Sequence, residues 1–269
     1  MAERAMSNGF DLEGKVAVIT GAGGDVGGAA AVLMAEQGAA VVAVDRYRQK
    51  LDALRGRMPS GANLLTVTAD VSSEDDVAGY VKAAKDTFGH IDIFFNNAGI
   101  EGSRTGAWQM IPDLALDDFN EIIAVNATGV FLGLKHVIPV MAAGGGGAIV
   151  NTSSINGLKG SRGQAAYVAS KHAVTAMTVV AAKEGAASNI RVNAIAPGAI
   201  NGRMLRDYVA ILQANAPTPS GEAAHYRPPP IEKWAEPREI AGLVLFLCSG
   251  DAASISGGCY SVDGGLIAM

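Results

Sequence analysis

The feature that most constrains the fold is a short apolar run that ends in a cluster of glycines. Residues 15–20 have the length and composition of a buried strand, and the glycine-rich residues 21–28 follow directly. Helical apolar spacing over residues 29–38 leads into a second strand-like run, residues 39–44, which stops at Asp45. This order of strand, glycine turn, helix, strand and acidic residue predicts a dinucleotide-binding βαβ unit.

Each part of this unit has a physical role in holding a nucleotide. Glycines let the backbone approach a pyrophosphate, and the following helix offers N–H groups and the positive end of its dipole. A carboxylate at Asp45 accepts hydrogen bonds from a ribose diol and repels a 2′-phosphate, which favours NAD over NADP. Arg46 leaves NADP open as an alternative, because its guanidinium could contact a 2′-phosphate or lie along the adenine.

The rest of the chain continues the alternation of strands and helices. We expect further strands at residues 64–68, 91–95, 148–153, 189–195 and 259–262, and helices at 74–88, 113–141, 164–187 and 237–248. This alternation predicts the α/β class, a doubly wound and mostly parallel sheet of the Rossmann type with helices on both faces. Residues 1–269 are expected to form a single domain, with a proline-punctuated lid at about 203–237 before the last helix.

Charge and composition argue against several classes of function. A net charge of −5 offers no broad basic surface for nucleic acid or an anionic membrane. We find no apolar run that approaches the roughly 20 residues of a membrane span, and residues 1–14 lack a signal-type apolar core. The scattered histidines and the two cysteines have no metal-ligand spacing. We therefore expect a cytoplasmic protein that needs no metal.

A second constellation carries reactive groups. Ser154 follows a strand-like run, and Tyr167 and Lys171 are spaced to share one face of the next helix. An adjacent ammonium group favours a phenolate, which would let Tyr167 act as an acid or base near neutral pH. The alternative, for this pair considered alone, is that Tyr167 and Lys171 are ordinary surface residues without a catalytic role.

Taken together, these motifs and several others resemble the short-chain dehydrogenase/reductase family over about residues 12–265. The resemblance rests on Thr20-Gly21-x5-Gly27, Asp70-Val71, Asn96-Asn97-Ala98-Gly99, Val125-Asn126, Ser154, Tyr167-x3-Lys171, Asn193, Pro197-Gly198 and Val262-Asp263-Gly264-Gly265.

The resemblance implies four catalytic residues. Tyr167 is the expected general acid/base, and Lys171 is expected to lower its pKa and to hold the nicotinamide ribose. Ser154 is expected to hydrogen-bond the substrate oxygen, and Asn126 to fix a water that links Lys171 to solvent. For Asn126 alone, a polar residue that bends its helix is the alternative.

The resemblance also implies an NAD site. The residues expected to hold the cofactor are Gly21, Gly23, Asp25, Val26, Gly27, Asp45, Arg46, Asp70, Val71, Asn97, Ala98, Gly99, Tyr167, Lys171, Pro197, Gly198 and Ile200.

Two positions depart from the family pattern. Asp25 stands where the middle glycine of the turn is usual, and we interpret it as an N-cap of the following helix. The alternative is that its carboxylate repels the pyrophosphate and weakens cofactor binding. Gly202 stands where the family often places a threonine that contacts the carboxamide; Asn201 is a possible substitute.

The resemblance implies an NAD-dependent oxidoreductase that acts on a secondary alcohol or ketone. The alternatives are an NADPH-dependent 3-oxoacyl reductase and a catalytically idle dinucleotide sensor. Expected pocket walls suggest an apolar, alicyclic or aromatic small-molecule substrate; they are Trp108, Met110, Tyr208, Tyr226 and Trp234. Lys159 and Arg162 are either an anchor for an acidic group or solvated loop charges. Relatives are often tetramers, so we expect a homo-oligomer, a tetramer or a dimer.

Overall fold

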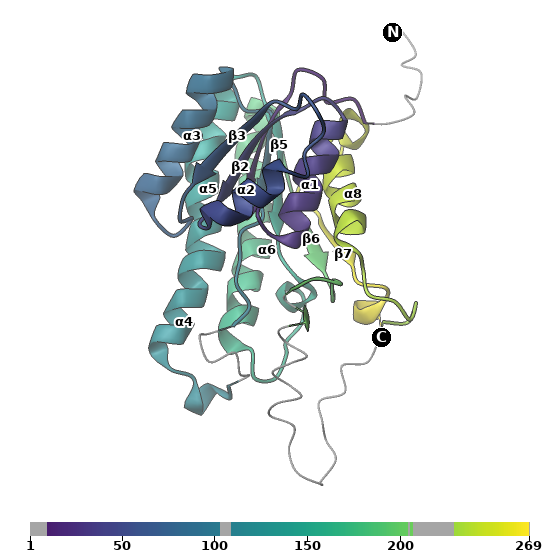
Figure 1. Cartoon of the computed structure of the whole chain (residues 1–269). Coiled ribbons are helices and arrows are strands. Elements are labelled where there is room, and N and C mark those ends of the chain that lie inside the picture. The colour runs from purple at the N-terminus through teal and green to yellow at the C-terminus, as the bar shows by residue number, and fades with distance from the viewer. Residues whose placement is uncertain (1–9, 103–108, 204, 207–228, 269) are drawn as a thin grey trace.

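Seven parallel strands form one sheet in the computed structural model, which describes residues 10–102, 109–203, 205–206 and 229–268 (Figure 1). The strand order is β3-β2-β1-β4-β5-β6-β7, and all six pairings are parallel. The strands are β1 (Val16–Thr20), β2 (Ala40–Asp45), β3 (Leu64–Thr68), β4 (Ile93–Asn96), β5 (Gly147–Thr152), β6 (Ile190–Pro197) and β7 (Cys259–Val262). This arrangement confirms the predicted α/β class.

Helices cover both faces of the sheet (Figure 1). Their bounds are α1 (Asp25–Glu36), α2 (Arg48–Arg55), α3 (Glu74–Phe88), α4 (Leu116–Ile123), α5 (Gly129–Ala143), α6 (Ala165–Gly185) and α8 (Pro237–Cys248). Helices α1, α2 and α8 contribute to one buried core, and α3, α5 and α6 contribute to the other. The sheet therefore separates two hydrophobic layers, as in a doubly wound fold.

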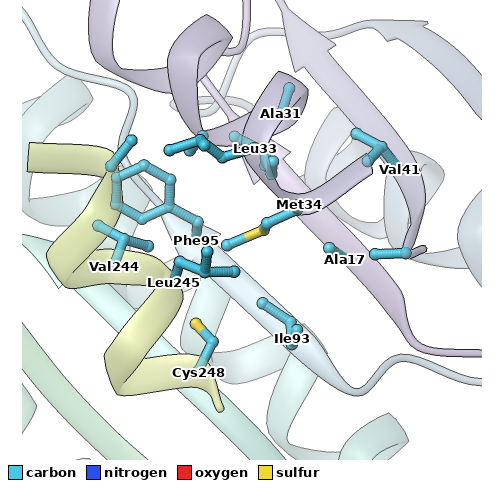
Figure 2. Close-up of a cluster of buried hydrophobic side chains, with 14 of the residues drawn as sticks. Ala17, Ala31, Leu33, Met34, Val41, Ile93, Phe95, Val244, Leu245 and Cys248 are labelled. Atoms are coloured by element: carbon cyan, nitrogen blue, oxygen red, sulfur yellow. The ribbon is translucent and has the colours of Figure 1, made fainter. Parts of the chain in front are cut away.

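The central strands are apolar on both sides because each side meets a layer of helices. In β1, Ala17 and Ile19 join the core beneath α1 and α8, while Val16 and Val18 join the opposite core. Figure 2 shows the first of these cores, where Phe95 of β4 lies among side chains of α1 and α8. This explains why the strands read as continuous apolar runs and not as alternating ones.

The order of the strands fixes where a ligand can bind. The chain proceeds from β1 outward to β3, then returns to place β4 on the other side of β1. At such a reversal the connections leave β1 and β4 toward opposite faces, and a crevice opens at the carboxyl ends of the strands. Several of the sequence motifs noted above follow a strand at this edge, since Gly21 follows β1, Asn97 follows β4 and Ser154 lies just beyond β5.

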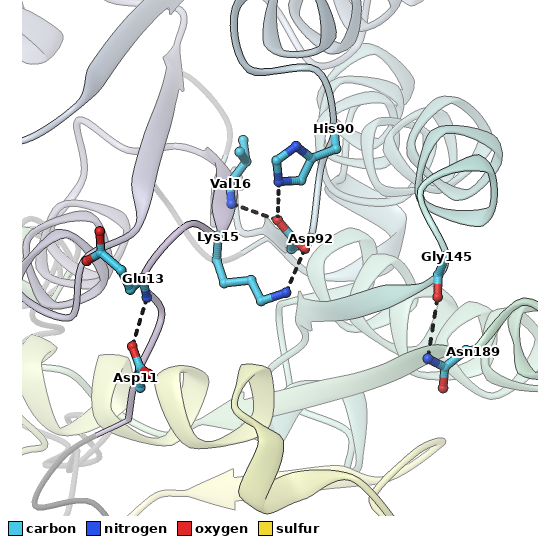
Figure 3. Close-up of polar contacts among 8 residues, drawn as sticks. All are labelled: Asp11, Glu13, Lys15, Val16, His90, Asp92, Gly145 and Asn189. Atoms are coloured by element: carbon cyan, nitrogen blue, oxygen red, sulfur yellow. Dashed lines mark hydrogen bonds and ion pairs between the residues drawn. The ribbon is translucent and has the colours of Figure 1, made fainter.

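The opposite edge of the sheet is held by polar contacts (Figure 3). Asp92, just before β4, accepts hydrogen bonds from the backbone N–H of Val16 at 2.9 Å and from Lys15 Nζ at 3.0 Å. The ring of His90 lies 3.0 Å from the same carboxylate. These contacts tie the start of β4 to the start of β1, away from the motif-bearing edge.

The helices differ from the sequence expectation in two places. Helix α2 was not predicted, because it is short and only Leu51 and Leu54 are buried. The single helix expected at residues 113–141 is instead a 3₁₀ turn at Ile111–Asp113, then α4, a π-helical turn at Ala124–Thr128, and α5. The π turn lies at Asn126, so the regular hydrogen-bond ladder changes at a predicted site residue.

The stretch Leu116–Ala143 corrects a further expectation. Its most apolar window has a mean hydropathy of 1.5, so by length and composition it could cross a membrane. In the fold, however, Val130, Val137 and Met141 of this stretch are part of the buried core. We therefore interpret its apolar character as that of a core helix.

Candidate active site

A cavity of about 790 Å³ lies at the carboxyl ends of the strands, across the reversal between β1 and β4. Most of the predicted site residues line it: Gly21, Asp25, Val26, Gly27, Asp45, Arg46, Asp70, Val71, Asn97, Ala98, Gly99, Ser154, Tyr167, Lys171, Pro197, Gly198 and Ile200. Gly23 and Asn126 do not line it. Sequence motifs that lie far apart in the chain therefore meet around one space.

The turn after β1 is shaped as a cradle. Gly21 has a φ of +66°, which favours glycine, and Gly24 N–H donates to its carbonyl at 3.0 Å. A Cβ on Gly27 would lie 2.3 Å from the Gly21 carbonyl oxygen, so any larger residue would push the turn open. Because the first turn of α1 faces the cavity here, the turn fits the pyrophosphate of a dinucleotide.

The N-cap interpretation of Asp25 is wrong. Helix α1 begins at Asp25 itself, and its N-cap residue is Gly24, so no side chain caps this helix end. The Asp25 carboxylate instead accepts a hydrogen bond from the backbone N–H of Arg203 at 2.7 Å. Its partner therefore belongs to the segment after β6.

Asp45 is held rigidly at the end of β2. Its two carboxylate oxygens each accept a backbone hydrogen bond at 3.0 Å, one from Gly23 and one from Tyr47, and the residue is only 8% exposed. Gly23 thus acts by positioning this carboxylate. Each oxygen keeps a lone pair free, so Asp45 can still accept hydrogen bonds from a ribose diol.

Asp70 is a further fixed carboxylate beyond β3. Burial favours a raised pKa, but hydrogen bonds from Ser72 and the nearby Arg46 guanidinium outweigh it and lower the pKa of Asp70. The backbone N–H and the hydroxyl of Ser72 lie 2.9 and 2.6 Å from its Oδ1. Asp70 is therefore ionised at neutral pH.

The loop after β4 is fastened to the end of β1. Thr20 Oγ1 accepts hydrogen bonds from the backbone N–H groups of Asn97 at 2.9 Å and Ala98 at 3.0 Å. The Asn97 side chain donates to the Thr20 carbonyl at 3.0 Å and accepts from Thr152 at 3.1 Å. These contacts hold the predicted Asn97–Gly99 wall against the glycine turn.

The reactive set is brought together by β5 and α6. Lys171 Nζ lies 5.6 Å from the centre of the Tyr167 ring and donates to the Thr152 carbonyl at 2.9 Å. Burial lowers the pKa of Lys171 to about 8. Ser154 follows β5, and its Oγ accepts the Asn156 N–H at 3.1 Å. Within the described residues the Ser154 hydroxyl has no protein acceptor, so its proton is available to a ligand.

Asn126 lies beneath this set, fully buried. Its side chain accepts from the Ile100 N–H and donates to the Ile100 carbonyl, both at 2.8 Å, and donates to Ser170 Oγ at 3.0 Å. Because it stands in the π turn, the structure agrees with the idea of a residue that distorts its helix. Both of its N–H donors are already used by the protein.

Several cavity residues escaped the sequence analysis. Glu101, Asn156, Ser161 and Gln164 line the cavity without having been singled out, whereas Lys159, which also lines it, was a candidate anchor for an acidic group. The sequence did offer a signal for Glu101, because a charged residue follows closely after the predicted strand and the Asn96–Gly99 motif. Asn156 lies in a 3₁₀ turn and Gln164 directly before α6, and neither is part of a sequence motif.

None of the five apolar and aromatic residues expected to form the pocket walls is found lining the described cavity. Trp108, Tyr208 and Tyr226 lie outside the described residues, as does much of the proposed lid, residues 204 and 207–228. Met110 and Trp234 are described, and neither lines the cavity. Among its described lining residues, the large aliphatic side chains are those of Ile100, Val125, Ile155, Leu205 and Leu266.

The chain is similar over most of its length to several known proteins. A family model described as "Enoyl-(Acyl carrier protein) reductase" matches residues 21–267. Levodione reductase of Leifsonia aquatica is 38% identical over 254 residues, covering 93% of each chain, and a levodione reductase crystal structure superposes with a TM-score of 0.87. Cyclohexanol dehydrogenase of Acinetobacter sp. (strain SE19) is 36% identical, covering 97% of this chain and 98% of its own. The crystal structure of NAD⁺-bound xylitol dehydrogenase is 35% identical, with a TM-score of 0.85 and coverage of 94% and 99%.

Proposed function

Because this chain belongs to the short-chain dehydrogenase/reductase family, it is a nicotinamide-dependent oxidoreductase, and we propose that it interconverts an alicyclic secondary alcohol and its ketone with NAD. One observation carries this proposal: Ser154, Tyr167 and Lys171 line the same cavity as Asp45. Oxidation of an alcohol removes one proton and one hydride, and this cavity combines a proton-handling set with a nucleotide-binding turn.

The residues present fit a nicotinamide dinucleotide. The turn at Gly21 and Gly27 would take the pyrophosphate, and Asp45, which lines the same cavity, would bind the adenosine ribose. Tyr167 and Lys171 would then hold the nicotinamide ribose. When bound, the cofactor supplies the hydride acceptor for alcohol oxidation and the donor for ketone reduction.

Tyr167 moves the proton in this scheme. It takes the proton of the alcohol hydroxyl during oxidation and returns it to the carbonyl oxygen during reduction. Lys171, when charged, favours the phenolate of Tyr167. Ser154 donates a hydrogen bond to the reacting oxygen, which is consistent with its hydroxyl already accepting the Asn156 N–H.

Asn126 is the proposed link from Lys171 to solvent. Since Ile100 and Ser170 occupy its side-chain donors, a relay water would be held through the backbone carbonyls of the π turn. A Cβ on Gly99 would lie 3.2 Å from Asn126 Oδ1 and 3.4 Å from Lys171 Nζ, so the two residues approach the same point.

The substrate class rests on two kinds of support. The large apolar side chains that line the described part of the cavity are mainly aliphatic, which suits a saturated ring better than an aromatic stack. One relative is named a cyclohexanol dehydrogenase. An NADPH-dependent 3-oxoacyl reductase is the rival; it is disfavoured by Asp45, which would repel a 2′-phosphate.

The proposal is tested by offering cyclic secondary alcohols with NAD⁺ or NADP⁺ and following the absorbance of the reduced cofactor. We expect turnover, with NAD⁺ preferred. Turnover with NADP⁺ only would favour the rival reductase. Cofactor binding without turnover of any alcohol or ketone would favour the idle sensor.

We also propose that the protein is a cytoplasmic homo-oligomer. Large apolar side chains are exposed on neighbouring helices, among them Leu116 of α4, Phe131 of α5 and Val180 of α6. Burial of these side chains against a second copy would remove apolar surface from water. Light scattering after size-exclusion chromatography tests this, and a monomer would contradict it.

A further inference from the structure

Glu101 is an ionisable residue of the cavity to which the proposed proton transfer assigns no role. The Glu101 carboxyl lines the same space as Ser154 and Tyr167. It directly follows Ile100, whose backbone N–H and carbonyl are both held by Asn126 at 2.8 Å. Glu101 is therefore fixed relative to the helices that carry the reactive residues.

A chain of hydrogen bonds runs from Ser154 to this carboxyl. The Asn156 N–H donates to Ser154 Oγ, and the Asn156 amide donates to Gln164 Oε1 at 2.5 Å. The Gln164 amide in turn donates to Glu101 Oε1 at 3.3 Å. Gln164 is only 8% exposed, so this chain is held firmly. This chain of hydrogen bonds fixes the position of the Glu101 carboxyl relative to Ser154, the residue that would bind the reacting oxygen of the substrate.

The carboxyl is poorly satisfied by the protein. The bond from Gln164 is longer than the usual 2.7–3.2 Å and is the only one that the Glu101 side chain receives within the described residues. Lys159 lines the same cavity but forms no ion pair with it there. Burial raises the pKa of Glu101. A half-buried carboxyl with so few partners destabilises the fold unless a ligand completes its hydrogen bonds.

We propose that Glu101 binds a second oxygen of the substrate, a hydroxyl on a ring carbon other than the one that is oxidised. This proposal rests on the proposed function and narrows it to neutral cyclic diols and hydroxyketones. An ionised carboxyl accepts a hydrogen bond from such a hydroxyl, with Gln164 holding its other oxygen. The same charge disfavours substrates that carry a carboxylate or phosphate nearby.

The test compares cyclohexanol with the cis and trans forms of 1,4-cyclohexanediol, using NAD⁺. The parent should have a higher kcat/KM for one of the two diols than for cyclohexanol. Glu101→Leu should lower kcat/KM for that diol about tenfold or more, and leave the value for cyclohexanol within about threefold, because only the diol loses a hydrogen bond. Glu101→Gln, which keeps an acceptor but removes the charge, should fall between. Glu184→Gln, on the exposed surface of α6, is the matched control and should leave both values unchanged.

An unchanged ratio of the two substrates in both Glu101 variants would overturn the proposal. Thermal melting and NADH binding show whether the variants are folded. If the parent turns over neither substrate with either cofactor, the proposed function fails by itself. Calorimetric titration of the NADH-loaded parent and Glu101→Leu proteins then decides the role of Glu101. Loss of diol affinity in the variant would support it, and equal affinity would refute it.

Discussion

Asp25 and Gly202 lie in direct contact, and both line the cavity. A Cβ at position 202 would stand 2.6 Å from Asp25 Oδ2, the same oxygen that accepts the Arg203 N–H. The two departures from the family pattern are therefore one feature of the structure. The carboxylate at position 25 occupies the space that a side chain at position 202 would need.

This contact predicts strong coupling between the two positions. Gly202→Ala in the parent should lower the free energy of unfolding by about 1–3 kcal/mol, because the added methyl group overpacks against the Asp25 carboxylate. In an Asp25→Gly background the same change should be nearly neutral. Urea denaturation of the parent, both single variants and the double variant measures the coupling. Additive effects would show that the contact carries no energy.

Cofactor choice should depend on the charge of Asp45. Asp45→Asn keeps an acceptor for one of the two backbone N–H groups but removes the repulsion of a 2′-phosphate. We expect the ratio of kcat/KM for NAD⁺ to that for NADP⁺ to fall about tenfold or more, which corresponds to roughly 1.4 kcal/mol. Asp113→Asn, an exposed change outside the cavity, is the control. A constant ratio would place the source of cofactor preference elsewhere, with Arg46 the next residue to test.

Removal of the Tyr167 hydroxyl should abolish most of the activity. Tyr167→Phe is expected to lower kcat by about 10²–10⁴-fold, the usual contribution of a positioned acid or base. NADH affinity should fall far less, because Lys171 would still hold the nicotinamide ribose. Tyr80→Phe serves as the control, since the Tyr80 ring is buried in the core between the sheet and α3. Equal rates for the parent and Tyr167→Phe with any substrate would rule out this proton transfer.

Lys171 should make stability depend on pH. Burial lowers its pKa to about 8, below the value near 10.4 that is typical of an unfolded chain. Below pH 8 both states are protonated and the buried charge destabilises the fold; between these pKa values the unfolded chain binds more protons, so this penalty fades as pH rises.

The variant Lys171→Met removes this group. Its stability relative to the parent should therefore be more favourable at pH 7 than at pH 10, by roughly 2 kcal/mol. Urea denaturation at both pH values gives the difference, and exposed Lys82→Met provides the control. A difference that does not vary with pH would mean that Lys171 keeps an ordinary pKa in the folded protein.

Elements with local signals were predicted closely from sequence. Helix α3 begins after Ser73, whose hydroxyl accepts the Asp76 N–H, and ends at Gly89 in the left-handed conformation. Helix α8 begins with Pro237 and a capping box between Glu236 and Glu239. In both cases the residues that fix the ends are neighbours in sequence, so their pattern is readable without the fold.

What the sequence did not reveal depends on distant partners. Asp25 resembles a helix cap locally, but its carboxylate bonds a residue 178 positions away. Glu101 has no motif of its own, because its partner Gln164 is 63 positions distant and its meaning comes from the cavity that they share. Such pairings follow from strand order and helix packing, which local patterns do not specify.

The two hydrogen bonds between Asn126 and the Ile100 backbone fix the position of the loop but leave its side chains free to vary. Asn126 binds only backbone atoms of Ile100, so it holds the loop without specifying any side chain in it. A lineage could therefore exchange the residues that follow Ile100 and meet new substrates, while the proton-handling helices keep their positions. Substrate specificity can therefore change on this scaffold while the catalytic residues and their reaction stay the same.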